Sequence, residues 1–257
     1  MAKTGTKNDL RVESILISQP KPETEKSPYF DLAKKFNVKI DFRPFIQVEG
    51  ISSKDFRKSR LNINDFSAII FTSRNSIDHF FRICEELRVK MSQETKYFCV
   101  SEAIALYLQK YTQYRKRKVF YGNGDLKDMY KLMLKHKDGG KFLLPCSDIH
   151  KKDLPNFLKK NKIVYSEAII YRTVASDLSD LEDIFYDMIV FFSPSGIQSL
   201  YHNFPDFKQN TTRIAAFGPA TSKAVIDAGL RLDVKAPMPN APSMTMAIEK
   251  YLNKVNK

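Results

Sequence analysis

Short apolar runs alternate with longer stretches of helical periodicity along most of the chain. The run AIIFT at 68–72 is continuously apolar, the pattern of a strand buried on both faces. The stretch 75–87 that follows places Ile77, Phe80 and Cys84 at spacings of three and four, which predicts a helix. Repeated alternation of this kind predicts parallel sheets whose strands are connected by right-handed helical crossovers.

The same criteria assign the other elements. Strands are predicted at 14–18, 38–42, 45–48, 97–100, 119–121, 141–144, 164–173, 188–192, 213–217 and 232–234. Further helices are predicted at 28–36, 102–111, 126–135, 154–160, 196–201, 221–228 and 243–252. Ser27 is expected as an N-cap before Pro28, and Gly229 as the glycine that ends its helix. Pro145 is expected to end the strand that precedes it.

Two runs of such units, separated by extended segments, predict two α/β domains. A connector that leaves near residue 45 and returns near residue 170 indicates that one domain is inserted into the other. The predicted fold is therefore two parallel-sheet α/β domains joined by a two-stranded connector, with an active-site cleft between them. The expected ranges are 1–44 plus 172–257 for the discontinuous domain and 45–171 for the inserted domain, with connector strands near 43–49 and 165–173.

Hydroxyl side chains and small residues follow several predicted strands, where the next helix begins. These turns lie at 72–75, 101–104, 145–147, 193–196 and 218–221. Hydroxyls and free amides at helix N-termini bind anions, and the carboxyl ends of parallel strands share one edge of a sheet. The turns therefore predict a surface that holds several carboxylates or phosphates without metal. Each hydroxyl taken alone is also explained as a helix N-cap.

The charge balance supports an anionic partner. The chain has 257 residues, 42 of them Lys or Arg and 29 Asp or Glu, a net charge of +13. The segment 44–171 holds 24 of the basic and 14 of the acidic residues. Its densest run, 115–118, is either a solvated basic loop or a nucleic-acid contact with Tyr114 as a stacking face. Phe120 and Tyr121 are better explained by a buried strand.

The sequence disfavours several classes of protein and of site. No apolar run approaches the roughly 18 residues of a membrane span, and the polar segment 1–10 has no signal-peptide core, so a cytoplasmic protein is expected. Cys84, Cys99 and Cys146 are odd in number and lack CxxC spacing, which argues against a disulfide framework or a structural zinc site. Nucleophile-elbow, P-loop, GxGxxG and HExxH motifs are absent. The four histidines are scattered, and His79 is expected to serve packing.

Five segments in order along the chain resemble the uroporphyrinogen-III synthase family. They are IIFTSRNSID (69–78), YSEAIIYRT (165–173), VFFSPSGIQSL (190–200), IAAFGPATSKAV (214–225) and APMPNAPSMTMAI (236–248). The resemblance runs from about residue 15 to 252 and implies the same inserted two-domain fold. It implies a linear tetrapyrrole substrate with eight carboxylates, hydroxymethylbilane, which is cyclised with loss of water and inversion of ring D. It implies no cofactor or metal, and we expect a monomer.

The resemblance also assigns residues. Tyr171 matches the family tyrosine and is the candidate that assists departure of the hydroxyl; alternatively, it packs the domain junction. The candidate carboxylate-binding residues that match family turns are Thr72, Ser73, Ser193, Ser195, Gly196, Gly218 and Thr221. Lys151 or Lys152 takes the place of a basic residue of the family. Ser101 and Ser147 are candidates from their own strand-end turns.

Three positions depart from the family pattern. The turn Ser101-Glu102-Ala103-Ile104 lacks a threonine and introduces an acid, Ala220 stands where threonine is frequent, and Asn240 replaces another threonine. These departures keep two alternatives open. One is an altered homologue that binds a tetrapyrrole or other polyanion without forming the type III product. The other is a nucleic-acid-binding protein that uses the region 114–121, for which the sequence gives less support.

Overall fold

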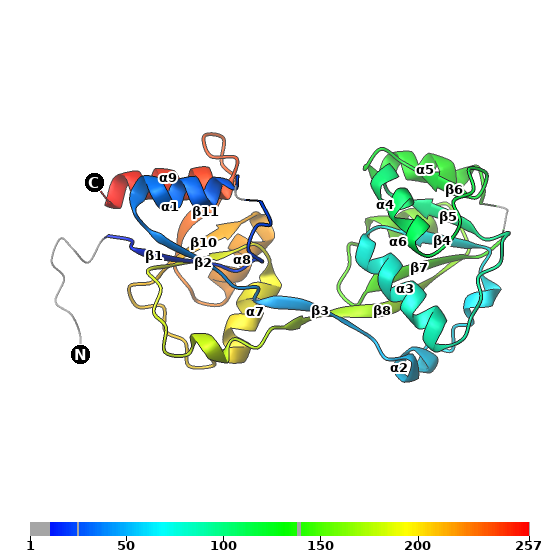
Figure 1. The fold of residues 1–257 in the computed structure, drawn as a ribbon, viewed down its shortest axis with the longest axis horizontal. Helices are drawn as coiled ribbons and strands as arrows, with labels where there is room; N and C mark the ends of the chain where they lie inside the picture. The colour runs from blue at the N-terminus through cyan, green and yellow to red at the C-terminus, as the bar shows by residue number, and fades with distance from the viewer. Residues whose placement is uncertain (1–10, 25, 138–139, 257) are drawn as a thin grey trace. The chain divides into compact units, whose positions relative to one another are not determined.

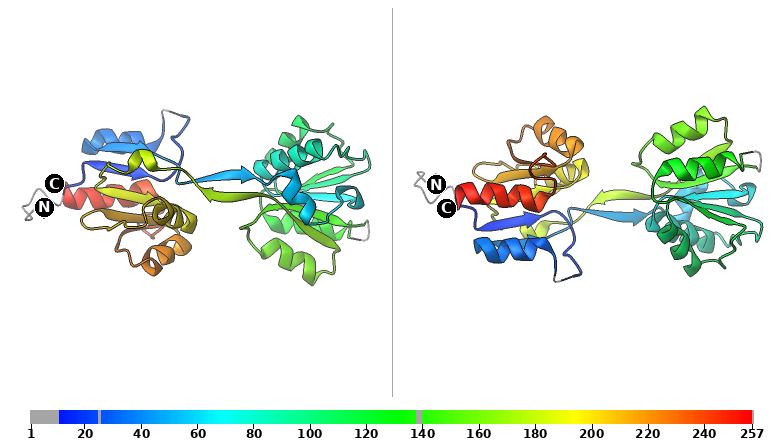
Figure 2. Two further views of the ribbon diagram at one scale, coloured as in Figure 1. Left: turned by 90° about the horizontal axis from the view of Figure 1, so that it is seen from below. Right: turned by 90° about the horizontal axis from the view of Figure 1, so that it is seen from above.

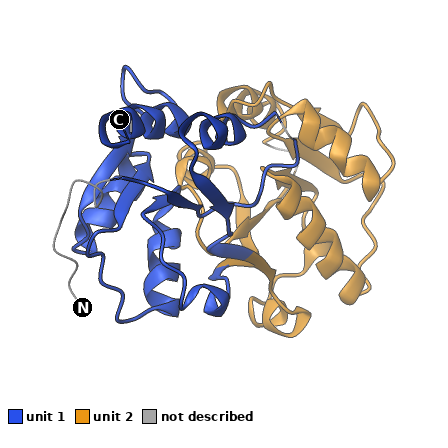
Figure 3. Cartoon of the chain, turned by 60° about the vertical axis from the view of Figure 1, so that its left-hand side comes forward, with its two compact units in different colours: residues 1–47, 174–257 blue, residues 48–173 orange. Residues whose placement is uncertain are grey.

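The computed structural model describes residues 11–24, 26–137 and 140–256. The polar segment 1–10, where no signal peptide is expected, lies outside these residues. The chain divides into two compact units, residues 1–47 with 174–257 and residues 48–173 (Figure 3). The domain boundaries expected from the sequence, at 44/45 and 171/172, lie a few residues from these unit boundaries.

The chain passes from one unit to the other along two strands, β3 (Ile46–Gly50) and β8 (Tyr165–Ala175). β3 pairs with β8 at one edge of the six-stranded sheet. The backbone bonds from Ser176 N to Phe45 O (2.9 Å) and from Ile51 N to Ile170 O (3.0 Å) have the register of an antiparallel pair. The extended segments that the sequence predicts near 45 and 170 are therefore confirmed as strands.

The first unit is built on a parallel sheet with the strand order β11-β10-β9-β1-β2 (Figure 1). Its strands are β1 (Ser14–Ile17), β2 (Lys39–Phe42), β9 (Met188–Phe191), β10 (Arg213–Phe217) and β11 (Leu232–Ala236). Its helices are α1 (Pro28–Phe36), α7 (Pro194–Asn203), α8 (Pro219–Asp227) and α9 (Met244–Val255), with a 3-10 turn at Ser179–Leu181.

Each face of this sheet has its own core. Ile15 and Ile17 of β1 pack with the buried side chains of α1 and α9, whereas Leu16 packs with those of α7 and α8. This division follows from the alternation of side chains along a strand. The strands are apolar on both sides because helices cover both faces, as the two views in Figure 2 show.

The second unit has the strand order β3-β8-β7-β4-β5-β6, and all pairs from β8 to β6 are parallel. Its further strands are β4 (Ala68–Phe71), β5 (Lys96–Cys99), β6 (Val119–Tyr121) and β7 (Phe142–Ser147). Its helices are α2 (Ser53–Lys58), α3 (Arg74–Glu86), α4 (Glu102–Tyr107), α5 (Leu126–Leu134) and α6 (Asp153–Lys160), with 3-10 turns at Ile63–Asp65 and Leu108–Lys110. Buried residues of α3 and α4 form the core on one face and those of α5 and α6 on the other.

The structure corrects two local predictions and adds one short helix. The strand at 141–144 does not stop at Pro145: β7 continues to Ser147, because its pairing with β4 ends at Leu143 and Pro145 lies where only β8 is paired. Ser27 is at the N-cap position, but its side chain makes no capping hydrogen bond. α2 was not predicted; Ser52 caps it by accepting from Asp55 N at 3.1 Å.

Gly229 lies at the end of α8, as expected from the sequence. Its φ of 74° is in the left-handed region, directly after the C-cap residue Ala228. The alternating α/β pattern and the parallel sheets are also confirmed.

Candidate functional site

The carboxyl edge of the second unit's sheet carries serines that begin helices. Ser73 Oγ accepts from Ser76 N at 3.1 Å, and Ser76 Oγ accepts from Ser73 N at 3.2 Å, which makes a capping box for α3. Ser101 Oγ accepts from Ile104 N at 3.4 Å at the start of α4. The N-cap explanation is therefore confirmed for both serines. A capping serine uses a lone pair of its hydroxyl oxygen to accept the hydrogen bond from the amide N–H. Its own O–H group can therefore still donate to an anion.

Glu102, the acidic residue of the Ser101 turn, already accepts a hydrogen bond from another side chain. Glu102 Oε1 accepts from the Tyr121 hydroxyl at 3.3 Å. The negative charge of Glu102, together with that hydrogen bond, raises the pKa of Tyr121. Glu102 is exposed, so its charge is screened by solvent.

The turn after β7 is held by its own side chains. Ser147 is only 6% exposed, and its hydroxyl donates to Asp148 Oδ1 at 2.8 Å. Ile149 N donates to the same carboxylate oxygen at 2.9 Å. Ser147 therefore shapes the turn, while Lys151, four residues on, is exposed.

Tyr171 lies beside Ser147 in the β7–β8 register. Its ring stacks on that of His79 of α3, with ring centroids 5.2 Å apart and 26° between planes. Gly50 of β3 allows this packing: a Cβ on Gly50 would lie 2.8 Å from His79 Nδ1. Strands and a helix of the second unit thus fix the tyrosine's position.

The ionisation of this pair follows from burial. Burial raises the pKa of Tyr171, while a hydrogen bond with Ser73 opposes the shift and the nearby Cys146 adds to it. Burial and the charge of Arg82 lower the pKa of His79, against the attraction of Asp78. At neutral pH, Tyr171 is therefore a protonated donor. His79 is a neutral ring whose Nδ1 is buried without a hydrogen-bond partner among the described residues. The packing role expected for His79 is therefore observed, but the sequence did not indicate its contact with Tyr171.

A cavity of about 240 Å³ opens at the same edge of the second unit. Thr72 and Lys151 line it, together with Val100 after β5 and the end of β7. Its other lining residues are Leu126, Leu144, Cys146, His150, Leu154 and Pro155. The structure therefore brings together two of the predicted site residues in one mostly apolar cavity with a cation at its wall.

In the first unit the corresponding turns follow β9 and β10. Ser193 Oγ accepts from Gly196 N at 3.3 Å and caps α7, while Ser195 is partly exposed. Gly218 precedes α8 with a φ of 89°, which favours glycine. Thr221 lies in the first turn of α8 and is 3% exposed. The five predicted residues of this unit thus occupy two neighbouring helix starts, because β9 and β10 are adjacent strands.

Asp78 of α3 accepts hydrogen bonds from two tyrosines, Tyr107 of α4 and Tyr111. Its carboxylate accepts from the hydroxyls of Tyr107 at 2.9 Å and Tyr111 at 2.5 Å, and Lys110 Nζ lies 3.7 Å away. Arg74, at the start of α3, lies over the Tyr107 ring at 5.2 Å from its centroid. Burial raises the pKa of Asp78, but the tyrosine hydrogen bonds and Lys110 outweigh it and hold the pKa below the ordinary value of an aspartate.

We expect Asp78→Asn to reduce the acid dependence of stability. A carboxyl with a lowered folded-state pKa contributes stability that is present above its unfolded pKa and is lost as pH falls through the folded pKa. The variant should lose on the order of 1 kcal/mol at neutral pH and less at acidic pH. Urea unfolding at several pH values measures this difference, with Asp31→Asn as the control because Asp31 is an exposed residue of α1. Parallel pH profiles for wild type and Asp78→Asn would contradict the assignment.

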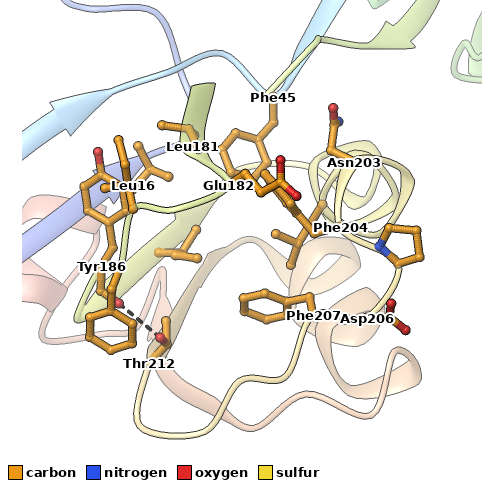
Figure 4. A pocket seen from close by; sticks show the side chains of 15 residues that line it. Leu16, Phe45, Leu181, Glu182, Tyr186, Asn203, Phe204, Asp206, Phe207 and Thr212 are labelled. Carbon is orange, nitrogen blue, oxygen red and sulfur yellow. Dashed lines mark hydrogen bonds between the residues drawn. The ribbon is translucent and has the colours of Figure 1, made fainter. Parts of the chain in front are cut away.

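A second cavity, of about 360 Å³, lies in the first unit (Figure 4). It is at the amino ends of β9 and β10, where the Thr212 hydroxyl donates to Tyr186 O at 3.0 Å. Its lining is mostly apolar, with Phe45, Phe204 and Phe207 among the side chains. None of the predicted site residues lines it, so we place the candidate site at the carboxyl edges.

The basic run 115–118 is partly paired. Arg115 donates to Gln93 at 2.9 Å, and Lys118 forms an ion pair with Glu94 at 2.5 Å. Tyr114 packs against the core, as does Phe120 of β6 on the other face. These contacts agree with the solvated-loop explanation of the run.

The three cysteines are buried free thiols. Burial raises the pKa of each thiol to about 12. In the parts of the chain that the structure describes, no helix has the length and apolar character needed to cross a membrane.

The fold and these strand-end turns define a protein of two α/β units in which helices begin with hydroxyl-bearing or glycine residues at the carboxyl edges of both sheets. The family model described as "Uroporphyrinogen-III synthase HemD" matches residues 28–246. The chain therefore belongs to the uroporphyrinogen-III synthase family, as the sequence motifs predict.

Individual relatives agree. The uroporphyrinogen-III synthase of Saccharomyces cerevisiae is 28% identical over 123 residues, which cover 42% of this chain and 45% of that protein. The chain thus matches somewhat less than half the length of this relative. The crystal structure of uroporphyrinogen-III synthetase from Helicobacter pylori has a TM-score of 0.57 at 18% identity, covering 94% of this chain and 99% of that one. A mutant uroporphyrinogen III synthase from Thermus thermophilus has a TM-score of 0.50 at 15% identity, with the same coverage. Both share the fold.

Proposed function

We propose that this protein is a uroporphyrinogen-III synthase, which cyclises hydroxymethylbilane with loss of water and inversion of ring D. The observation that carries the proposal is the family match over 28–246. It is supported by a partly buried, protonated tyrosine, Tyr171, beside a hydroxyl-rich sheet edge. The substrate's carboxylates suit the net charge of +13 and the helix starts.

In the proposed reaction the Tyr171 hydroxyl donates its proton to the departing hydroxyl of the substrate. The C–O bond breaks with its electron pair, water leaves, and an azafulvene cation remains. Ring D attacks this cation through its substituted carbon and passes through a spiro intermediate. Rearrangement and loss of a proton then give the inverted product and balance the proton that Tyr171 donated. Stacking on His79 and contact with Ser73 hold the donor in place.

The protein's second task is orientation, because the free substrate closes directly to the type I isomer. We propose the following residues as carboxylate binders: Thr72, Ser73, Ser101, Ser147, Lys151, Ser193, Ser195, Gly196, Gly218 and Thr221. Several contacts that hold one reacting geometry lower the entropic cost of ring closure. Ser147 is proposed with its backbone as the contacting group, since its hydroxyl donates to Asp148.

The direct test is a coupled cyclisation assay. Hydroxymethylbilane is generated in place, and the oxidised uroporphyrin isomers are separated by chromatography. Predominantly type III product supports the proposal. Type I product alone, formed at the uncatalysed rate by folded protein, contradicts it and favours the altered-homologue alternative.

We expect Thr221→Ala to raise KM several-fold with little change in kcat. The backbone amides at the start of α8 remain and share the carboxylate, so the loss of one hydroxyl costs about 1 kcal/mol. Steady-state kinetics measures both constants, with Thr211→Ala as the control because Thr211 is exposed outside the helix starts. A KM equal to that of the wild type would remove Thr221 from the binding surface.

We further infer a cytoplasmic monomer that requires no cofactor. The family resemblance supports all three inferences. In addition, the proposed chemistry needs only a proton donor and an oriented substrate, so it requires no cofactor. Light scattering after size-exclusion chromatography tests the oligomeric state, and a stable dimer would contradict it.

A further inference from the structure

Three metal-ligand side chains of the second unit converge outside the Tyr171 contact. Cys146 Sγ, a ring nitrogen of His150 and a carboxylate oxygen of Glu167 all lie within 4.8 Å of one another. Cys146 and Glu167 come from the paired strands β7 and β8, and His150 comes from the turn after β7. Sulfur, imidazole nitrogen and carboxylate oxygen together are the donor set of zinc-like cations, whereas Mg²⁺ and Ca²⁺ prefer oxygen alone.

The backbone fixes which nitrogen of His150 is available. His150 Nδ1 lies 2.7 Å from the carbonyl oxygen of Ser147, which can only accept, so Nδ1 carries the proton. In the neutral ring, Nε2 is then an unprotonated lone pair that faces Glu167 Oε2 at 2.9 Å. Two lone pairs at this separation repel each other unless a proton on Nε2 or another cation lies next to them. A backbone carbonyl on the second nitrogen is also the usual support of a metal-bound histidine.

Lys152 supplies a cation at this point. Its Nζ lies 3.2 Å from His150 Nε2 and 3.3 Å from Glu167 Oε2, so one ammonium group contacts both acceptors. The Lys152 side chain is 62% exposed, whereas those of His150 and Glu167 are 15% and 30% exposed. The lysine can therefore swing into solvent and leave the two acceptors and the thiol in place.

We propose that Cys146, His150 and Glu167 bind one zinc-like divalent cation, for which the Lys152 ammonium substitutes when no metal is bound. A tetrahedral zinc site separates its ligand atoms by about 3.5 Å, so small side-chain rotations within the present cluster suffice. Cys146 and His150 line the cavity described above. The fourth coordination position is therefore open to that cavity, where a water or an anionic group can complete the site.

The proposal goes beyond the proposed function and does not depend on it. The cation is an additional ligand of the cavity wall and takes no part in the cyclisation derived above. The sequence does not indicate the site, because Glu167 reaches the other two ligands only through the pairing of β8 with β7.

The test is a titration of the full chain with Co²⁺, followed by displacement with Zn²⁺. We expect one equivalent to bind, with the intense visible bands of a tetrahedral ion and a sulfur-to-metal charge-transfer band. Zn²⁺ should remove both signals. Octahedral Co²⁺ spectra without the charge-transfer band, or no saturation at millimolar Co²⁺, would overturn the proposal.

Variants identify the ligands. Cys146→Ser should abolish the charge-transfer band, and His150→Gln and Glu167→Gln should each weaken binding 10- to 100-fold. Cys84→Ser is the matched control, because it removes a buried thiol of α3 that lies outside the cluster. Circular dichroism verifies that each variant is folded. An unchanged band in folded Cys146→Ser overturns the site.

Lys152→Met provides a test with the opposite sign. Removing the competing ammonium while keeping the side chain's length should tighten Co²⁺ binding several-fold. Weaker binding in this variant would contradict the substitution of lysine for metal. All these measurements are spectroscopic, so their results do not depend on the result of the cyclisation assay.

Discussion

Tyr171→Phe should lower kcat for type III product about 100-fold while leaving the protein folded. General acids contribute on the order of 10² to 10⁴ to a rate, and phenylalanine removes only the proton donor. The ring still stacks on His79 at the same place, so packing is retained. A 100-fold loss corresponds to about 2.7 kcal/mol of transition-state stabilisation. Because burial raises the pKa of Tyr171, wild-type activity should persist to a higher pH than the ordinary pKa of a tyrosine would allow.

Tyr165→Phe is the matched control for this prediction. Tyr165 begins the same strand, and its hydroxyl donates to Pro155 O at 3.3 Å, away from the serine turns. This variant should keep kcat within a factor of about two, since it loses only partly exposed hydrogen bonds, to Pro155 O and to Glu167. Full activity of Tyr171→Phe would remove the tyrosine from the mechanism and leave it the packing role that the sequence also allowed.

Phe71→Ala should destabilise the protein by about 3 to 5 kcal/mol, the cost of truncating a fully buried phenylalanine. Phe71 ends β4 directly before Thr72, and it is 0% exposed. Its ring lies 5.5 Å from that of Phe80 of α3 and 6.1 Å from that of Tyr97 of β5, measured between centroids. The cavity left by alanine removes contacts that hold α3, and with it Ser73, against the sheet.

Guanidinium unfolding measures this effect as a lower transition midpoint. Phe185→Ala serves as the control, because Phe185 is 60% exposed and its truncation should change stability by less than about 0.5 kcal/mol. Equal midpoints for the two variants would show that Phe71 does not hold the second unit's core together.

Periodicity predicted much of the fold because buried strands and amphipathic helices leave different apolar spacings. The helix at 28–36 and the strands at 119–121 and 213–217 have the predicted bounds. Periodicity does not predict how β7 continues through Pro145. A strand tolerates proline only where the neighbouring strand needs no hydrogen bond from that residue, and this depends on how the strands pair in the sheet. The short helix α2 was missed because its six residues contain one buried side chain, Phe56, too few to give a period.

The sequence by itself determined the family, the parallel α/β class and the strand-end turns, since each depends on residues that are neighbours along the chain. Only the tertiary structure decided which of these residues meet. It stacked Tyr171 on His79, gathered Thr72 and Lys151 around one cavity and brought Glu167 to Cys146 and His150. Such contacts join segments that are far apart in sequence. They depend on strand register and helix packing, which local sequence patterns do not determine.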